Sequence, residues 1–197
     1  EEYGGYYAWG ETEEKDLYSW STYKWCNGTE NSMTKYCSNS EYGIVDNKTT
    51  LDPEDDVAHV KWGGNWRTPT LAEQQELIDK CTWVWTTLNG VNGYEITGPN
   101  GNSIFLPAAG CRNNFEAYFQ NTFGYYWSGL LSSDYDNNAS LLFLESEYCD
   151  WRGGGACGER RIQTCRCIRD FETFPAFGCH PLYAGCNCRI RFVPYFI

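Results

Sequence analysis

The stretch that decides the fold is residues 62–81, with the sequence WGGNWRTPTLAEQQELIDKC. It begins with a glycine-containing turn that carries two tryptophans, and Thr70 and Glu73 follow with the spacing of a capping box. In a capping box each side chain bonds the backbone N–H of the other residue, so a helix starts there. The spacing of the apolar residues predicts a helix over Leu71–Cys81. Its apolar side carries Leu71, Leu77, Ile78 and Cys81.

Downstream of this helix the pattern changes from a helical repeat to short strands. Three runs are rich in β-branched and aromatic residues: 83–87, 94–97 and 103–107. Asn-Gly pairs at 89–90 and 92–93, and the sequence Gly-Pro-Asn-Gly at 98–101, lie between these runs and favour tight turns. Together these signals predict a meander of antiparallel strands.

Upstream of residue 62 the sequence predicts little regular structure. Residues 6–10 predict a short strand, and residues 18–50 predict a long ordered loop because they have no periodicity and many small polar residues. A helix is expected to start at Asp52, which can cap it, because Pro53 suits the first turn. A calcium site is the alternative, but consecutive acidic side chains point in different directions, so capping is favoured. That site would consist of Asp52, Glu54, Asp55 and Asp56.

The composition favours a recognition protein. Aromatic residues make up 17% of the chain, with nine Trp and fifteen Tyr. Rigid rings among small polar residues are typical of binding surfaces, although nine Trp are too many to be ligand contacts alone, so some must fill an irregular core. The net charge of −11 argues against nucleic acid or an anionic membrane as the partner. No apolar stretch is long enough to predict a membrane-spanning helix.

The eleven cysteines indicate an oxidising compartment, so we expect a secreted or surface-displayed protein. The sequence starts at Glu1, which is not an initiator, so any signal peptide or lipid anchor is expected to lie outside it. An odd number of cysteines leaves at least one thiol unpaired or intermolecular. Most are crowded toward the C-terminus: Cys149, Cys157, Cys165, Cys167, Cys179, Cys186 and Cys188.

Several motifs, occurring in order along the chain, resemble a known family. They are Asp56-x-Ala58 with the 62–73 motif, LPAAG of 106–110 with Arg112, and GYYWS of 124–128. Together they resemble the major paralogous domain of Fibrobacter and Bacteroidetes surface proteins. That family is similar to the formylglycine-generating-enzyme branch of the C-type lectin fold, whose scaffold also carries the variable proteins of diversity-generating retroelements. The resemblance covers roughly residues 6–170.

This resemblance implies an α+β, C-type-lectin-like fold with two helices, a twisted antiparallel sheet and much irregular loop. The domain is expected to span 1–170, with a Cys-rich extension at 171–197 packed on it. In diversified members, mutagenic reverse transcription rewrites asparagine codons in a C-terminal stretch, so the ligand-binding face differs between copies. We therefore expect an adhesin- or receptor-type protein on a cell or phage surface. Its partner would be a protein or another surface ligand of a host, cell or phage target.

The candidate recognition segment is 129–158. Tyr126–Ser128, Leu142 and Leu144 are expected in the core, with Trp151 as a buried anchor, whereas the residues between them follow no period. Substituted asparagine codons can yield all nine residues of 149–158 other than Trp151. The predicted ligand-binding residues are Gly129, Leu130, Tyr135, Ser140, Leu141, Phe143, Tyr148, Cys149, Asp150, Arg152, Gly153, Gly154, Gly155, Ala156 and Cys157.

Within this set, three aromatic rings would be anchors and two charged groups would be polar contacts. The rings are Tyr135, Phe143 and Tyr148, and the charged groups are Asp150 and Arg152. A binding surface with so many small residues is not expected to bind tightly unless it is displayed in multiple copies. The alternative interpretation is a flexible Gly-rich loop closed by a Cys149–Cys157 disulfide.

The end of the chain departs from the family. Residues 164–170 match its usual ending, but the expected glycine is replaced around Ile162, and 171–197 extend beyond it. Disulfides joining this tail to Cys157, Cys165 or Cys167 are favoured over a zinc site, whose spacing would match no common zinc pattern. The zinc ligands would be Cys179, His180, Cys186 and Cys188, and residues 189–193 predict a terminal strand.

A catalytic function is the alternative class. The formylglycine-generating relatives are oxidases that hold copper with a cysteine pair, but the cysteines here lie in a glycine tract and a tail without a matched motif. The sequence has no phosphate loop and no nucleophile elbow, and Glu145 with Glu147 is typical of a solvated strand edge. The calcium motifs of sugar-binding lectins do not occur. We therefore expect a binding protein without a catalytic site or cofactor, with a non-diversified structural surface module as a further alternative.

Overall fold

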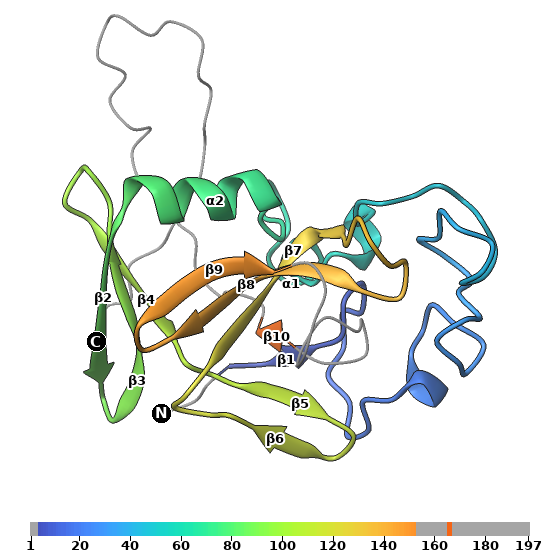
Figure 1. The fold of residues 1–197 in the computed structure, drawn as a ribbon, viewed down its shortest axis with the longest axis horizontal. Coiled ribbons are helices and arrows are strands. Elements are labelled where there is room, and N and C mark those ends of the chain that lie inside the picture. The colour runs from blue at the N-terminus through green and yellow to red at the C-terminus, as the bar shows by residue number, and fades with distance from the viewer. Residues whose placement is uncertain (1–3, 153–164, 167–197) are drawn as a thin grey trace, which may run out of the picture.

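The computed structural model describes residues 4–152 and 165–166 of the 197-residue chain. Within them the chain is α+β, with two α-helices and three small, mainly antiparallel sheets (Figure 1). The helical segments are η1 Trp20–Thr22, η2 Pro53–Asp55, α1 Val57–Trp62 and α2 Leu71–Lys80, where η marks a 3₁₀ turn. The strands are β1 Tyr6–Tyr7, β2 Thr82–Leu88, β3 Val91–Thr97, β4 Ser103–Pro107, β5 Cys111–Asn113, β6 Glu116–Tyr118, β7 Gly124–Leu131, β8 Ala139–Glu145, β9 Tyr148–Arg152 and β10 Cys165–Arg166.

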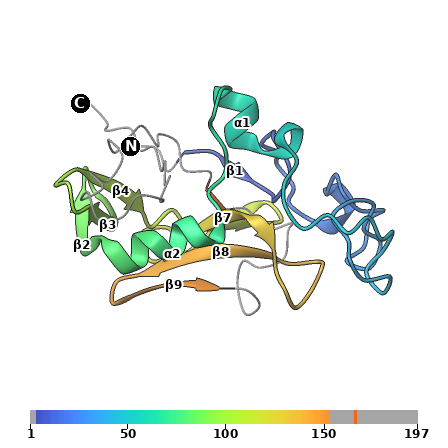
Figure 2. The same cartoon turned by 90° about the horizontal axis from the view of Figure 1, so that it is seen from above.

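The strands are divided among sheets of five, three and two strands. The largest has the order β1-β10-β7-β8-β9, and all of its neighbours are antiparallel except β10 and β7. The meander β2-β3-β4 and the hairpin β5-β6 form the other two sheets. Helix α2 packs against β7, β8 and β9, as Figure 2 shows from above. The large sheet therefore has α2 on one side. It also pairs β1, the first strand of the described chain, with β10, the last.

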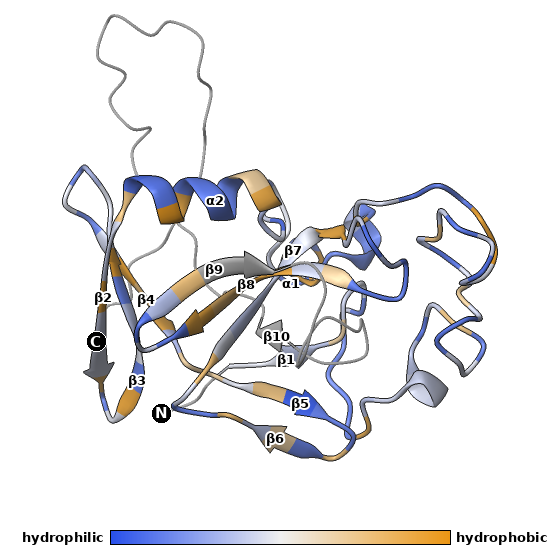
Figure 3. Cartoon of the chain, viewed as in Figure 1, coloured by the Kyte–Doolittle hydropathy of each residue, from blue (hydrophilic) through white to orange (hydrophobic). Residues whose placement is uncertain are grey.

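Helix α2 forms as the sequence predicts. The Thr70 hydroxyl accepts a hydrogen bond from Glu73 N (3.2 Å), and Glu73 Oε2 accepts one from Thr70 N (2.8 Å). Leu77 is buried, with Ile78 and Cys81 packed beside the neighbouring core. Figure 3 shows polar residues along much of the helix. The capping box and the apolar side were both predicted correctly, with the helix ending one residue earlier, at Lys80.

The predicted meander is also present, with one turn assigned wrongly. Asn89 and Gly90 have φ values of 51° and 83° and form the tight turn between β2 and β3. The pair Asn92-Gly93 is instead inside β3, where Gly93 faces β4. A Cβ at Gly93 would lie 2.3 Å from the carbonyl oxygen of Leu106. This glycine therefore serves the close approach of two strands and not a turn.

Strands β7 and β8 form the centre of the molecule because both of their faces are covered. One face packs into a cluster of Trp9, Tyr36, Cys111, Tyr125, Trp127, Leu131, Ala139, Leu141 and Phe143. The other face packs into a cluster of Tyr94, Ile96, Leu106, Tyr126, Leu142 and Leu144. These clusters confirm the core positions predicted at Tyr126–Ser128, Leu142 and Leu144.

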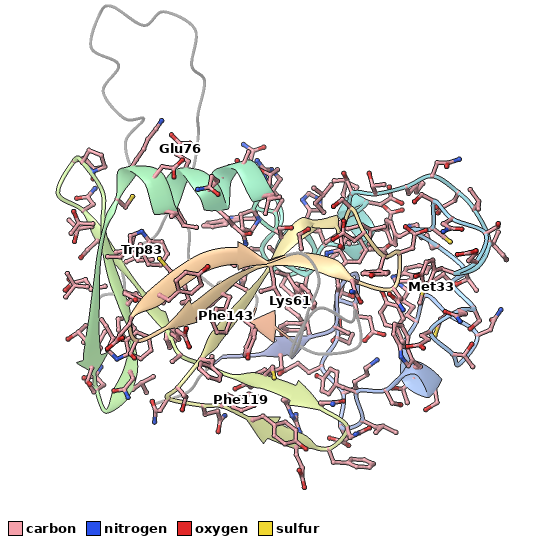
Figure 4. All side chains as sticks on the ribbon, in the orientation of Figure 1. Met33, Lys61, Glu76, Trp83, Phe119 and Phe143 are labelled. Carbon is pink, nitrogen blue, oxygen red and sulfur yellow. The ribbon has the colours of Figure 1, made fainter. Side chains whose placement is uncertain are left out.

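Residues 8–56 form an ordered region that we call the loop lobe. As predicted for 18–50, its regular structure is limited to short turns, including η1 and η2. Aromatic side chains hold it together through their polar ends: Tyr23 Oη donates to Trp9 O (2.8 Å), and Trp25 Nε1 donates to Gly10 O (2.7 Å). Met33, labelled in Figure 4, is fully buried within the lobe. The rings therefore supply both the core and the hydrogen bonds of this region.

The helix after the loop lobe starts later than the sequence suggests. The expected cap, Asp52, precedes only the 3₁₀ turn, and its side chain makes no capping bond. Asp56 caps α1 instead, because its Oδ1 accepts from the backbone N–H groups of Ala58 (3.0 Å) and His59 (3.4 Å). The helix begins at Val57 because the carboxylate of Asp56, not that of Asp52, reaches its open N–H groups.

Candidate functional site

Four of the predicted ligand-binding residues lie in the core. Ser140, Leu141 and Phe143 are 3%, 1% and 5% exposed, and Gly129 is also buried. The Ser140 hydroxyl donates to Leu131 O (3.1 Å), and the Phe143 ring packs 5.3 Å from that of Tyr125. The expectation that these side chains form an exposed face is therefore wrong, because β8 is covered on both sides.

Two other predicted residues present aromatic rings to solvent. Tyr135, in the loop that joins β7 to β8, is 50% exposed, and Tyr148, the first residue of β9, is 43% exposed. Leu130 is half-buried. Cys149 is also half-buried and packs against the cluster that contains Leu142 and Leu144. Two of the three expected aromatic anchors are thus accessible.

The two exposed rings lie near opposite ends of β8. At one end Leu131 pairs with Ala139, next to the loop that carries Tyr135, and at the other Glu145 pairs with Tyr148 (Figure 1). At a strand rise of about 3.3 Å per residue, these ends are roughly 20 Å apart. Tyr135 and Tyr148 therefore do not belong to one compact patch.

The chain leaves β9 at the end where Tyr135 lies. Arg152 pairs with Leu141, close to the loop between β7 and β8. We call this region the loop-end surface: Leu130, residues 132–138 and the exit of the chain from β9. The side chains of Asp150, Trp151 and Arg152, all of Gly153, Gly154, Gly155, Ala156 and Cys157, and any Cys149–Cys157 disulfide lie outside the described residues.

A buried carboxylate fixes the loop that carries Tyr135. Asp136 is 6% exposed and accepts hydrogen bonds from Ser38 N (2.6 Å), Ser38 Oγ (2.8 Å) and Asn39 N (2.6 Å). These bonds join residues almost a hundred positions apart, so no local sequence signal predicts them. They attach the Tyr135 loop to the loop lobe and give the exposed ring a rigid support.

A pocket lies around the turn at 62–67. This pocket is shallow, with about 20 Å³ of enclosed space and the rest open to solvent, and we call it the Trp62–Trp66 pocket. Its main walls are Tyr7, Trp9, Trp62, Trp66, Pro69 and Trp127. The rings of Trp62 and Trp66 meet edge to face, with centroids 6.0 Å apart. The sequence signal for this pocket is the pair of tryptophans on either side of two glycines.

A buried ionic cluster borders this pocket and was not predicted. Asp55, 1% exposed, accepts from Lys24 Nζ (3.1 Å), Lys35 Nζ (2.6 Å) and Tyr36 Oη (2.7 Å). Burial opposes ionisation of Asp55, but the bonds from Lys35, Tyr36 and Lys24 outweigh it and lower the pKa of this carboxyl. Lys35 also pairs with Asp52 (2.6 Å). In the acidic run 52–56, Asp52 and Asp55 thus pair with lysines and Asp56 caps a helix. This differs from the alternative calcium site, in which the carboxylates would bind one ion.

Few other features in the described region suggest chemistry. Among residues 4–152 and 165–166, no three His, Cys, Asp or Glu side chains gather as a metal site would require. Glu145 lies at the end of β8, while Glu147 lies in the turn before β9. The zinc ligands considered at Cys179, His180, Cys186 and Cys188, the tail disulfides and the strand at 189–193 all lie outside the described residues.

The described residues contain two short α-helices, of six and ten residues. None that the structure describes is long and apolar enough to span a bilayer. The longest, α2, has ten residues and carries charged side chains on its outer face. A spanning helix needs about twenty, mostly apolar, residues.

Comparison of the chain with protein-family models, with curated proteins and with solved structures finds no match. The class that the described residues define is therefore α+β, with two helices and three small sheets. The likeness of the 62–73, 106–112 and 124–128 motifs to the major paralogous domain remains a sequence-based proposal.

Proposed function

We propose that this chain is a C-type-lectin-like binding protein, displayed outside the cell, whose C-terminal region is diversified by a retroelement. It binds a protein or another surface ligand at the loop-end surface and performs no catalysis. The proposal combines the resemblance of three sequence motifs with the position of Tyr135. The accessible part of the predicted recognition segment is smaller than the sequence suggests and excludes the core of β8.

Contacts among the three motifs support a shared scaffold. Tyr126, in the third motif, donates through its hydroxyl to Pro107 O of the second (2.5 Å). Next to the third motif, Gly129 N donates to Pro69 O of the first (2.9 Å). The bridge between Gly110 and Gly124 joins the second and third motifs again. Residues that are far apart in the sequence but belong to the family-like pattern thus form one connected unit.

The exposed ring of Tyr135 is the observation that carries the binding proposal. Half of this side chain is accessible, although the residue after it is buried and bonded to the loop lobe. A large ring on a rigid support offers contact area without the entropy cost of ordering a loop. Strand β9 ends on the same side of the sheet, where Arg152 pairs with Leu141.

Diversification at this surface is compatible with folding. Substitution of an exposed residue away from special features usually changes the free energy of unfolding by less than about 0.5 kcal/mol. Truncation of a buried ring such as Phe143 costs about 3–5 kcal/mol. A retroelement that varied Ser140, Leu141 and Phe143 would therefore produce many unfolded copies. We expect these three residues and Trp151 to be constant, and the variable positions to be Leu130, Tyr135, Asp150 and 152–157.

Sequencing of this locus across a population of its source tests the diversification. Substitutions are expected at Leu130, Tyr135, Asp150 and 152–157, while Trp127, Phe143 and Trp151 stay fixed. A constant 150–157 would contradict diversification. Substitutions as frequent at Phe143 as at Tyr135 would contradict the assignment to the loop-end surface.

Two display libraries test the tolerance directly. One randomises Asp150 and 152–157, and its matched control randomises Ser140, Leu141 and Phe143. The fraction of protease-resistant displayed clones is expected to be high in the first library and at least about tenfold lower in the second, because losses of about 2–5 kcal/mol at each of several buried positions together reach the total stability of about 5–15 kcal/mol that a domain has. Equal resistance in both would mean that burial does not restrict variation here.

A further inference from the structure

We propose that the Trp62–Trp66 pocket is a second binding site, which takes a proline-containing peptide segment in an extended, polyproline-type conformation. The pocket is formed by the strand at Tyr7, the turn 62–69 and Trp127 of β7. It includes none of the residues predicted for the diversified segment. The proposal is therefore independent of the binding function assigned to the loop-end surface.

The walls of the pocket are rigid aromatic rings. Trp9 Nε1 donates to Ser128 O (2.8 Å), and Trp127 Nε1 donates to Tyr7 O (3.1 Å), so both rings at the base are fixed by hydrogen bonds. Grooves between such rings are the common receptors of polyproline segments, since the proline ring packs flat against them and the ligand is already extended before binding.

Two glycines set the position of the Trp62 and Trp66 rings. Gly63 and Gly64 have φ values of 66° and 56°, which side-chain-bearing residues rarely adopt, and no atom would lie within 4 Å of an added Cβ at either. Glycine is therefore needed at these two positions for the backbone conformation, and not to make room for a neighbouring atom. The turn is closed by the contact of His59 Nδ1 with Trp66 O (3.1 Å). Trp62 and Trp66 are thus held together at the mouth.

The charged groups of the pocket are already occupied. Glu11 pairs with Lys15 Nζ (2.6 Å) and accepts from Lys24 N (2.8 Å). Asp55 holds two lysines, and Arg67 makes a two-pronged pair with Glu73 (2.8 and 2.6 Å). The group that enters the pocket must therefore be uncharged, because an ammonium or a carboxylate would find no partner to offset its desolvation.

Hydrogen-bonding capacity at the mouth distinguishes a peptide from a sugar. The indole N–H groups of Trp62 and Trp66 donate no hydrogen bond to any residue that the structure describes, so the mouth offers donors. Acceptors that line the pocket are already in use, because Glu11 and Asp55 pair with lysines and the Thr68 carbonyl accepts from Arg67 Nη1 (3.3 Å). A sugar hydroxyl needs acceptors as well as donors, whereas a proline segment presents carbonyl oxygens and no N–H. The chemistry therefore favours proline flanked by carbonyls.

The test uses the whole chain and a hexaproline peptide blocked at both ends. The nine tryptophans give separate indole N–H signals in a ¹H–¹⁵N spectrum, and Trp62→Phe and Trp66→Phe variants assign two of them. Titration is expected to shift these two signals with a dissociation constant on the order of 10⁻⁴ M, as a single shallow contact gives. The wild-type spectrum alone decides whether binding occurs, so the result does not depend on a variant folding.

Matched variants and probes complete the experiment. Each of the Trp62→Phe and Trp66→Phe changes keeps a ring but removes a donor, and is expected to weaken binding at least about fivefold. Trp83→Phe is the control, because Trp83 lies beside α2, away from Lys61 and the pocket helix α1 (Figure 4). No shift up to millimolar hexaproline would overturn the proposal. An equal response to a Gly-Ser peptide of the same length, or a response only to an oligosaccharide, would also overturn it.

Discussion

In the sheet half of the molecule, residues 71–149, the fully buried side chains are largely aliphatic, such as Ile96, Leu106 and Leu142. In the loop lobe they are mainly aromatic, and their polar ends bond the backbone, as Tyr23 Oη does at Trp9 O. The sheet half satisfies its backbone through strand pairing and helix bonds. The loop lobe uses side-chain carboxylates and hydroxyls for the same purpose.

The carboxylate of Asp46 illustrates how the loop lobe is ordered. It accepts from the backbone N–H groups of Tyr36 (2.9 Å), Cys37 (2.9 Å) and Lys48 (3.0 Å). Tyr36 has a φ of 59°, which is unfavourable for a large side chain, so these bonds hold a conformation that the backbone would not adopt alone. The comparison teaches that apolar area stabilises the sheet half in many small contributions, whereas a few directed bonds stabilise the loop lobe.

The largest effect is expected from Asp55→Ala in the loop lobe. The change leaves the Tyr36 hydroxyl without its buried acceptor and Lys35 with only Asp52 of its two close carboxylate partners, so the free energy of unfolding should fall by about 3–5 kcal/mol. Urea denaturation measures the loss. Glu54→Ala is the control, because its side chain is 72% exposed and should change stability by less than about 0.5 kcal/mol. Equal effects would mean that the directed bonds do not dominate.

Leu142→Ala tests the sheet half in the same assay. Leu142 is fully buried between β7, β9 and the meander. Removing its branched end should therefore lower the free energy of unfolding by about 3 kcal/mol, within the range of about 2–5 kcal/mol for such changes. Leu88→Ala, at a side chain that is 50% exposed, should cost far less. A loss below about 1 kcal/mol at Leu142 would show that the aliphatic core is loosely packed.

A smaller change is expected when pH falls. Burial opposes ionisation of Asp46, but the three backbone N–H bonds outweigh it and lower its pKa, and bonds from Lys35 and Lys48 lower that of Asp52. Because these folded-state pKa values lie below the unfolded value of about 3.9, the stabilisation is complete at neutral pH and is lost as pH falls from about 4 through the lower folded-state pKa values. Urea midpoints between pH 7 and 3 should fall, and Asp46→Asn should reduce that dependence. An unchanged dependence in the variant would assign it to other groups.

The smallest effect is expected from Thr70→Ala in the sheet half. The change removes the acceptor for Glu73 N at the start of α2 and should cost about 1 kcal/mol. Thermal unfolding of the variant checks this value. Gln75→Ala on the same helix removes only a bond to Asp79 and should cost at most about 0.5 kcal/mol. A larger loss for Gln75 than for Thr70 would contradict the capping role.

The sequence predicted those parts of the fold that depend on local patterns. The α2 capping box and the Asn89-Gly90 turn involve residues within three positions of each other, so their geometry is encoded nearby. The helix start was placed four residues too early, because Asp52 and Asp56 are equally good caps in the sequence. Contacts that depend on the tertiary fold distinguish them: Asp56 accepts from Thr68 N (2.7 Å) and Thr68 Oγ1 (2.8 Å), whereas Asp52 pairs with Lys35.

The candidate site was predicted less well for a related physical reason. Residues 139–144 show no alternation of polar and apolar side chains, and this absence suggested a variable surface. A strand that is covered on both faces also has no alternation, because every side chain faces a core. Leu141 and Phe143 belong to this second case. The support of Tyr135 by Asp136 joins distant segments, so local periodicity could not have predicted it.

The place of β10 between β1 and β7 sets the order in which the molecule can be completed during synthesis. Tyr7 pairs with Cys165, so the N-terminal strand is made roughly 160 residues before its neighbour. At about 5–20 residues per second, Tyr6 and Tyr7 wait on the order of 8–30 s for that partner. Until Cys165–Arg166 arrives, the edge of β7 and the first aromatic residues are exposed to other chains. Nascent chains halted before residue 165 should therefore depend on chaperones more than those released after it.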